Sequence, residues 1–155
     1  MRTVCEIGFN AGHSTLTWLE ANPNLVVYTF DINHWKYTEV MVNYLKAKYP
    51  RRLNSCFGDS TVTLPLVSAN TDIKCDVAVV DGGHEGNIPI IDIMNMKSFS
   101  HNETILLIDD IGLHKRAVFN AIATLRGNNT IEKIFANYDS EMKGGFGAFK
   151  YLGFS

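Results

Sequence analysis

The chain has 155 residues, enough for one domain with a substantial hydrophobic core. Its composition, 46% hydrophobic and 19% charged, is that of a globular protein and excludes a disordered or fibrous chain. With a net charge of −2 and no apolar run of membrane-spanning length, we expect neither nucleic acid nor a membrane as a partner.

Apolar runs of strand length alternate with segments of helical period along most of the chain. The predicted strands are Thr3–Ile7, Val26–Asp31, Leu53–Phe57, Asp76–Asp81 and Thr104–Asp109. The predicted helices are His13–Ala21, Trp35–Lys48, Val62–Ala69, Ile88–Phe99 and His114–Arg126. Such alternation indicates βαβ units, and near-continuous hydrophobic strands indicate a parallel sheet buried on both faces. The sequence therefore predicts a single doubly wound α/β domain over residues 1–155.

The C-terminal segment has a different pattern. Strand-like runs at Ile131–Tyr138 and Phe146–Leu152 are joined by a short turn around Glu141–Gly145, with no helix between them. Parallel neighbours need a long crossover, whereas antiparallel strands can be joined by a short turn. We therefore expect an antiparallel hairpin at one edge of the sheet.

Three cysteines lie inside apolar strand-like runs: Cys5, Cys56 and Cys75. An odd number without paired spacing favours free thiols in a reducing compartment. The N-terminus also lacks the apolar core of a signal peptide. We expect a cytoplasmic protein without disulfides.

Carboxylate side chains follow the predicted strands at their C-terminal ends. They are Glu6, Asp31, Asp59, Asp81, Asp109 and Asp110. Ligands of doubly wound sheets bind at this edge. A single carboxylate there is often only a helix N-cap, but N-capping is a poor explanation for six of them.

The first strand runs into the turn Glu6-Ile7-Gly8-Phe9-Asn10-Ala11-Gly12, which leads into a helix. A dinucleotide fingerprint would need G-x-G-x-x-G, but Asn10 and His13 replace two of its glycines. The turn instead resembles motif I of the class I S-adenosylmethionine (SAM)-dependent methyltransferases, [DE]-x-G-x-G-x-G, with Asn10 at the middle glycine. Asn tolerates left-handed backbone, so the turn is compatible with this substitution.

The resemblance extends over the whole chain and implies a Rossmann-like sheet of order 3-2-1-4-5-7-6 with strand 7 antiparallel. It implies that Gly8, Asn10 and Gly12 face the methionine part of the cofactor and that Glu6 orders the loop. Asp31 would accept hydrogen bonds from the ribose hydroxyls, which suits a carboxylate. The full set of implied cofactor-binding residues is Glu6, Gly8, Asn10, Gly12, Asp31, Asp59, Ser60 and Asp81, with Asp59 and Ser60 near adenine.

The fourth and fifth strands end in Val80-Asp81-Gly82-Gly83-His84 and Ile108-Asp109-Asp110. These segments resemble the metal site of the cation-dependent O-methyltransferases, the catechol, caffeoyl-CoA and macrolide-sugar branch. The resemblance implies a metal site at Asp81, Asp109 and Asp110, with Mg²⁺ as the candidate ion because oxygen-only ligands suit a hard cation. The simpler interpretation is that Asp109 and Asp110 cap a helix.

His84 falls where the catechol branch has a catalytic lysine, and its pKa range suits a general base. We therefore predict His84 as the catalytic residue in the O-methylation of a small hydroxylated molecule. Two alternatives remain open, a metal-independent methyltransferase and a catalytically silent cofactor-binding or interaction domain.

The resemblance has one gap. Cation-dependent relatives carry N-terminal helices that cover the cofactor, and this sequence has none before its first strand. We expect the cover to lie outside this sequence or to come from a partner subunit, and the sequence leaves open whether the chain forms a homo-oligomer.

Overall fold

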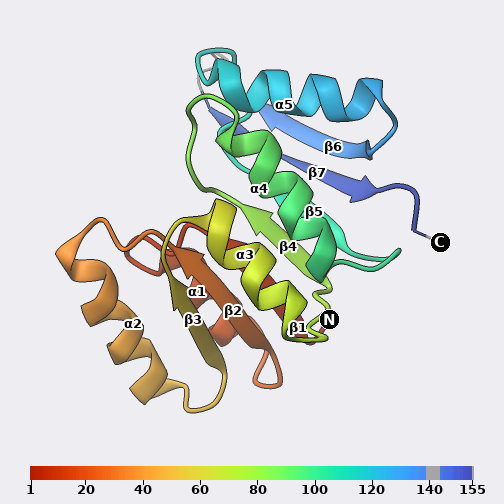
Figure 1. Ribbon diagram of the computed structural model, residues 1–155. Coiled ribbons are helices and arrows are strands. Elements are labelled where there is room, and N and C mark those ends of the chain that lie inside the picture. Colours follow the sequence, from red (N-terminus) through yellow and green to blue (C-terminus); the bar gives the residue numbers. More distant parts are fainter. Residues whose placement is uncertain (139–143, 155) are drawn as a thin grey trace.

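The computed structural model describes residues 1–138 and 144–154 (Figure 1). The strands are β1 (Thr3–Ile7), β2 (Val26–Asp31), β3 (Leu53–Phe57), β4 (Val77–Val80), β5 (Ile105–Ile108), β6 (Ile131–Tyr138) and β7 (Gly145–Tyr151). The helices are α1 (His13–Ala21), α2 (Lys36–Lys48), α3 (Ser60–Ala69), α4 (Ile88–Met96), the 3-10 helix η1 (Lys97–Phe99) and α5 (Arg116–Gly127).

The strands form one sheet of order β3-β2-β1-β4-β5-β7-β6, which confirms the predicted fold. The first five strands are parallel, and β7 runs antiparallel to both β5 and β6. The strand order reverses between β1 and β4, so their C-terminal ends flank the switch point where doubly wound sheets bind ligands. Most of the predicted turn at Glu141–Gly145 lies outside the described residues.

Several predicted boundaries were wrong by a few residues. Helix α3 begins at Ser60 rather than Val62, because the Asp59 side chain accepts a hydrogen bond from the Thr61 backbone N–H and caps the helix. Helix α5 begins at Arg116 rather than His114. The long predicted helix after Asn87 ends at Met96 and continues as η1.

The two faces of the sheet bury separate hydrophobic clusters. On β1, Val4 packs with Leu19 of α1 and Leu45 of α2. Its neighbour Cys5 points to the opposite face and joins the cluster that contains Ile93 of α4. Successive side chains of a strand point to opposite faces, so β1 contributes to both cores. This central strand is therefore held rigidly just below the predicted cofactor loop.

The structure brings two of the three thiols together. Cys5 and Cys75, both fully buried, lie in contact with their Cα atoms 5.8 Å apart, a separation that a disulfide can span, and Cys56 is free. The two residues are 70 positions apart in the chain. Only the pairing of β1 with β4 brings them together, which cysteine spacing in the sequence does not show.

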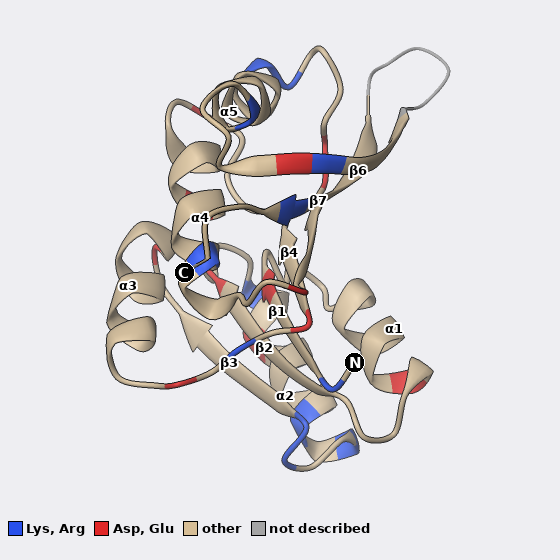
Figure 2. Ribbon diagram, turned by 90° about the vertical axis from the view of Figure 1, so that its right-hand side faces the viewer, with Lys and Arg blue, Asp and Glu red and all other residues tan. Residues whose placement is uncertain are grey.

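Charged residues are distributed over many elements of the fold (Figure 2). Lys and Arg lie in separate groups near the end of α2, on α5 and on the β6–β7 hairpin, rather than in one continuous stripe. Among the helices of the described ranges, none is both long and apolar enough to span a membrane.

Candidate functional site

The loop that follows β1, residues 8–12, is the predicted cofactor loop. It lies against the end of β4. Gly8 has a φ of +94°, and its backbone N–H donates to the Phe30 carbonyl of β2 (2.9 Å). A Cβ atom at Gly8 would lie only 2.0 Å from the Asp81 carbonyl oxygen. Only glycine allows this contact, so the loop and the end of β4 meet backbone to backbone. Asn10, at the middle position of the motif, adopts left-handed backbone with a φ of 49°, as its residue type permits.

Asp31, the last residue of β2, holds this loop in place through its side-chain hydrogen bonds. Its Oδ2 accepts a hydrogen bond from the Asn10 backbone N–H (2.8 Å), and its Oδ1 accepts one from the Asn33 N–H (2.7 Å). The Tyr37 hydroxyl of α2 donates to Asn10 Oδ1 (2.7 Å) and closes the loop from the other side. Each Asp31 oxygen keeps a further lone pair for a ligand.

Glu6 lies below the loop rather than in it. It is 1% exposed and accepts hydrogen bonds from the Ser14 and Thr15 hydroxyls of α1. Burial raises the pKa of Glu6 to about 7, and the two hydroxyl hydrogen bonds only partly oppose that effect. Glu6 therefore connects β1 to the first turn of α1. The sequence analysis did not identify Ser14 and Thr15 as its partners.

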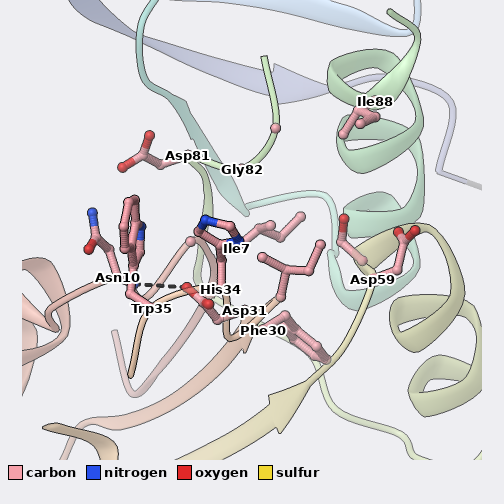
Figure 3. A pocket seen from close by; sticks show the side chains of 14 residues that line it. Ile7, Asn10, Phe30, Asp31, His34, Trp35, Asp59, Asp81, Gly82 and Ile88 are labelled. Atoms are coloured by element: carbon pink, nitrogen blue, oxygen red, sulfur yellow. Dashed lines mark hydrogen bonds between the residues drawn. The ribbon is translucent and has the colours of Figure 1, made fainter. Parts of the chain in front are cut away.

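A cavity of about 290 Å³ opens at the C-terminal ends of β1, β2 and β4 (Figure 3). This volume is close to the lower limit for small-molecule sites. Figure 3 shows Asp81 and Asp59 on opposite sides of the cavity, with Asp31 between them. The lining residues are Ile7, Gly8, Asn10, Phe30, Asp31, Ile32, His34, Trp35, Asp59, Ser60, Asp81, Gly82, Gly83 and Ile88.

The cavity therefore brings together most of the predicted cofactor-binding residues. Gly8, Asn10, Asp31, Asp59, Ser60 and Asp81 line it, and Glu6 and Gly12 support its loop from outside the lining. Gly12 has a φ of +78°, and a Cβ there would lie 2.5 Å from the Phe9 ring. Its backbone N–H donates to the Phe9 carbonyl (2.7 Å), which closes the turn, and Gly12 is not among the residues that line the cavity.

The end of the cavity near α3 carries two hydrogen-bonded side chains. Asp59 accepts from the backbone N–H (2.9 Å) and the hydroxyl (2.7 Å) of Thr61, and these bonds lower its pKa. The Ser60 hydroxyl donates to Oδ1 of Asp92 on α4 (2.7 Å). Asp92 is fully buried, and the sequence analysis did not predict a role for it.

Aromatic residues form an exposed rim beside Asp31. Trp35 lies edge to face with His34 (centroids 4.7 Å apart) and stacks parallel to Tyr37 (6.0 Å). Trp35 and Tyr37 are largely exposed although they are large and apolar. His34 and Trp35 both line the cavity, so this rim offers a flat aromatic surface to a bound ring.

A second group of polar side chains adjoins the cavity at Asp81. Asp81, His84 and Asp110 offer ligand atoms that all lie within 4.8 Å of one another. His84 Nε2 is 3.2 Å from Asp110 Oδ2 and 3.9 Å from Asp81 Oδ1. Lys115 Nζ approaches from the start of α5, 3.5 Å from both Asp110 Oδ2 and His84 Nδ1.

The electrostatics of this acid–histidine cluster (Asp81, His84 and Asp110) suit a cation. Partial burial, with the charges of Asp109 and Asp110, raises the pKa of Asp81 to about 7. Burial and the nearby Lys115 lower the pKa of His84, and its buried Nε2 has no well-formed hydrogen bond among the described residues. Two carboxylate oxygens form a donor set that fits a hard divalent cation, and the neutral imidazole nitrogen beside them can accept a proton.

The predicted metal ligands therefore come together only in part. Asp81 and Asp110 converge, and His84 joins them in place of Asp109. Asp109 is exposed, yet it lies near enough for its charge to raise the pKa of Asp81. Asp110 has a positive φ of 55°, and this backbone bend directs successive carboxylates differently. The sequence could not show that bend.

Comparisons with known proteins agree with the fold described above. A family model described as "Methyltransferase domain" matches residues 5–111, while no curated protein sequence matches the chain. An O-methyltransferase from Bacillus cereus in complex with S-adenosylhomocysteine (SAH) superposes with a TM-score of 0.79 at 14% identity. The match covers 97% of this chain and 74% of that one. The O-methyltransferase TomG from Streptomyces achromogenes, involved in tomaymycin synthesis and solved with SAM, gives 0.77 at 18% identity, covering 98% and 74%. These likenesses establish the fold, and the matched model covers most of the chain: the protein belongs to the methyltransferase domain family.

Proposed function

We propose that the protein uses SAM to methylate a hydroxyl group of a small molecule with the help of a divalent cation. One observation carries this proposal. Asp81 lines the cavity and also belongs to the acid–histidine cluster, so a ligand in the cavity and an acceptor at the cluster would share one boundary. Methyl transfer requires the two ligands to be adjacent, because the acceptor oxygen attacks the methyl group of SAM directly. The rate of that attack depends mainly on the alignment of donor and acceptor.

The cofactor would lie along the cavity from Asp81 to Asp59. The loop at Gly8 and Asn10 allows close backbone approach at the methionine end, and Asp31 has free lone pairs for the ribose hydroxyls. The stacked Trp35 rim suits the flat adenine ring. SAM- and SAH-bound relatives of the same fold support this choice of cofactor.

Asp81 and Asp110 would hold the cation, with Mg²⁺ as the ion we favour, and Asp109 stays a predicted ligand. When bound, the ion would lower the pKa of an acceptor hydroxyl. His84 Nε2, which has no well-formed hydrogen bond among the described side chains, would take the proton from that hydroxyl. Its lowered pKa keeps the imidazole neutral and able to accept a proton near pH 7.

A metal-independent reaction is the second candidate, and Lys115 is the observation that favours it. Its ammonium group lies 3.5 Å from Asp110 Oδ2 and already balances part of the acidic charge without an ion. In that case the aspartates would orient Lys115 and His84 around the acceptor.

Two measurements test the proposal. Calorimetry should detect binding of SAM or SAH and no preference for NAD; binding of NAD alone would overturn the cofactor assignment. Transfer of a labelled methyl group to a panel of hydroxylated small molecules should then depend on Mg²⁺ and stop in EDTA. Transfer that persists in EDTA would favour the metal-independent reaction. Cofactor binding without transfer to any acceptor would favour a catalytically silent domain.

A further inference from the structure

Asp92 is a fully buried carboxyl group on α4 that the proposed reaction does not use. Its Oδ1 accepts the hydrogen bond from Ser60 Oγ at 2.7 Å. Its Oδ2 is buried and has no hydrogen-bond partner among the described residues. The Oδ2 atom lies against Gly82, where a Cβ would be only 2.7 Å away. The Ser60 hydroxyl is therefore the one donor that this part of the structure supplies to Asp92.

This hydrogen bond fixes the direction of the Ser60 proton. A serine hydroxyl has one proton to donate and two lone pairs that accept. If the proton turned toward the cavity, the buried carboxylate of Asp92 would lose its donor, which is unfavourable. Ser60 lines the cavity, so a ligand at this end meets its lone pairs and not its proton.

Asp59, the second polar side chain at this end of the cavity, also offers only hydrogen-bond acceptors. Asp59 already accepts two hydrogen bonds from Thr61, and its lowered pKa keeps it ionised and without a proton to donate. Ser60 and Asp59 therefore both present hydrogen-bond acceptors to the cavity.

We propose that Asp92 is a positioning residue for cofactor specificity: by holding the Ser60 proton, it makes this end of the cavity select a purine with an amino group at C6 over one with a carbonyl. The amino group of adenine donates hydrogen bonds, whereas the carbonyl of a 6-oxopurine would face the Ser60 oxygen as acceptor against acceptor. This inference rests on the proposed SAM cofactor. It adds that the site recognises one substituent of the purine ring, the amino group at C6.

The charge state of Asp92 is consistent with this role. Burial raises the pKa of Asp92 to about 6, opposed in part by the Ser60 hydrogen bond. At pH 8 the carboxyl group is therefore ionised and accepts the Ser60 proton. The binding experiment is designed for that pH.

The test compares SAH with S-inosylhomocysteine, which differs at C6 of the purine, by calorimetry at pH 8. The wild-type protein should prefer SAH by on the order of 10- to 100-fold, the range expected when a polar group is left facing a mismatched partner. Ser60→Ala should reduce that preference about tenfold. Asp92→Leu should reduce it as well, because leucine is similar in size but has no acceptor, so the Ser60 hydroxyl can turn its proton toward a carbonyl ligand.

Ser68→Ala on the same helix is the matched control, because the Ser68 hydroxyl bonds to the Pro65 carbonyl and does not line the cavity. It should keep the wild-type preference. Equal binding of both ligands to the wild type, or an unchanged preference in Asp92→Leu, would overturn the inference while leaving the SAM assignment intact. If neither ligand binds the wild type, the proposed function and this inference both fail. If Asp92→Leu does not fold, Ser60→Ala at the other end of the bond decides the question.

Discussion

Asp31 holds the loop after β1 by hydrogen bonds, and the proposed function gives the same side chain a ligand to bind. Its two oxygens hold the backbone N–H groups of Asn10 and Asn33, so the loop and the start of the next segment are fixed before a ligand arrives. Such preorganisation reduces the conformational entropy lost on binding. A substitution at Asp31 would therefore remove the proposed ribose contact and also loosen the loop.

We expect Asp31→Ala to weaken SAH binding by about 1.5–3 kcal/mol, the contribution of a charged hydrogen-bond acceptor. Calorimetry measures the change directly. Asp72→Ala, at an exposed position outside the cavity lining, serves as the control and should bind SAH like the wild type. Unchanged binding by Asp31→Ala would show that the ribose lies elsewhere.

Glu6 predicts a pH dependence of stability. Its pKa is about 7 in the folded protein and 4.5 in the unfolded chain, so the native state binds the proton more tightly between these values. The free energy of unfolding therefore falls as pH rises from about 4.5 to 7 and stays low above that. The full effect of this one group is about 3 kcal/mol.

Glu6→Gln removes the titrating group while its carbonyl can still accept from Ser14 or Thr15. Urea denaturation at pH 5, 6, 7 and 8 should show a smaller decline for the variant than for the wild type. Asp81 and Asp92, whose pKa values are also raised, should leave part of the slope in place. Identical slopes in both proteins would mean that Glu6 is ionised in the fold throughout this range.

At the scale of elements, the contact between the β1 loop and the end of β4 tolerates no side chain. In Gly8→Ala the new Cβ would meet a backbone carbonyl, which cannot rotate away. We expect a loss of about 2–5 kcal/mol in unfolding free energy, from overpacking and left-handed strain together. SAH binding should be lost as well.

Gly86→Ala is the matched control for that substitution. Gly86 has a positive φ of +54°, but a Cβ there would have nothing within 4 Å. It should cost only the backbone strain, about 1–2 kcal/mol. Chemical denaturation compares the two variants, and equal losses would mean that the Gly8 contact adds nothing beyond strain.

The arrangement of the elements could be predicted from the sequence to a large extent. The alternation of strands and helices, with the helix-free hairpin after α5, predicted the parallel sheet and its reversed last strand. The glycine turn after β1 predicted the loop, because Gly8 and Asn10 have the residue types that positive φ requires.

What the sequence did not reveal are contacts between side chains far apart in the chain. Asp92 lies inside a helix, where an acidic residue is usually exposed, and only the packing of α4 against α3 brings it to Ser60. The positive φ of Asp110 and the approach of His84 to Asp81 and Asp110 are likewise not visible in the residue pattern. These features depend on rotamers and local backbone bends, which the residue pattern does not encode.

For the whole molecule, cation binding should be visible as stability. An ion that binds the folded acid–histidine cluster and not the unfolded chain raises the free energy of unfolding by mass action, about 2.7 kcal/mol at a concentration 100 times the Kd. We expect Mg²⁺ to raise the Tm of the wild type. Asp110→Ala should abolish the shift.

Two variants complete that experiment. Glu132→Ala, which removes a surface partner of Lys150 on the β6–β7 hairpin, should retain the shift. His84→Ala should also retain it while methyl transfer slows by roughly 10²–10⁴-fold, as for a lost general base. Loss of the shift in His84→Ala would make His84 a metal ligand, and the absence of any shift in the wild type would favour the metal-independent reaction.

The backbone contact between Gly8 and Asp81 also bears on how this enzyme could be redesigned. The spacing between the cofactor loop and the end of β4 is set by main-chain atoms, so exchanging side chains around the acceptor leaves it unchanged. Variant libraries that change the segments after β4 and β5 could therefore be screened for new acceptors, while the proposed position of SAM stays the same. The same contact marks Gly8 as a position to exclude from any such library.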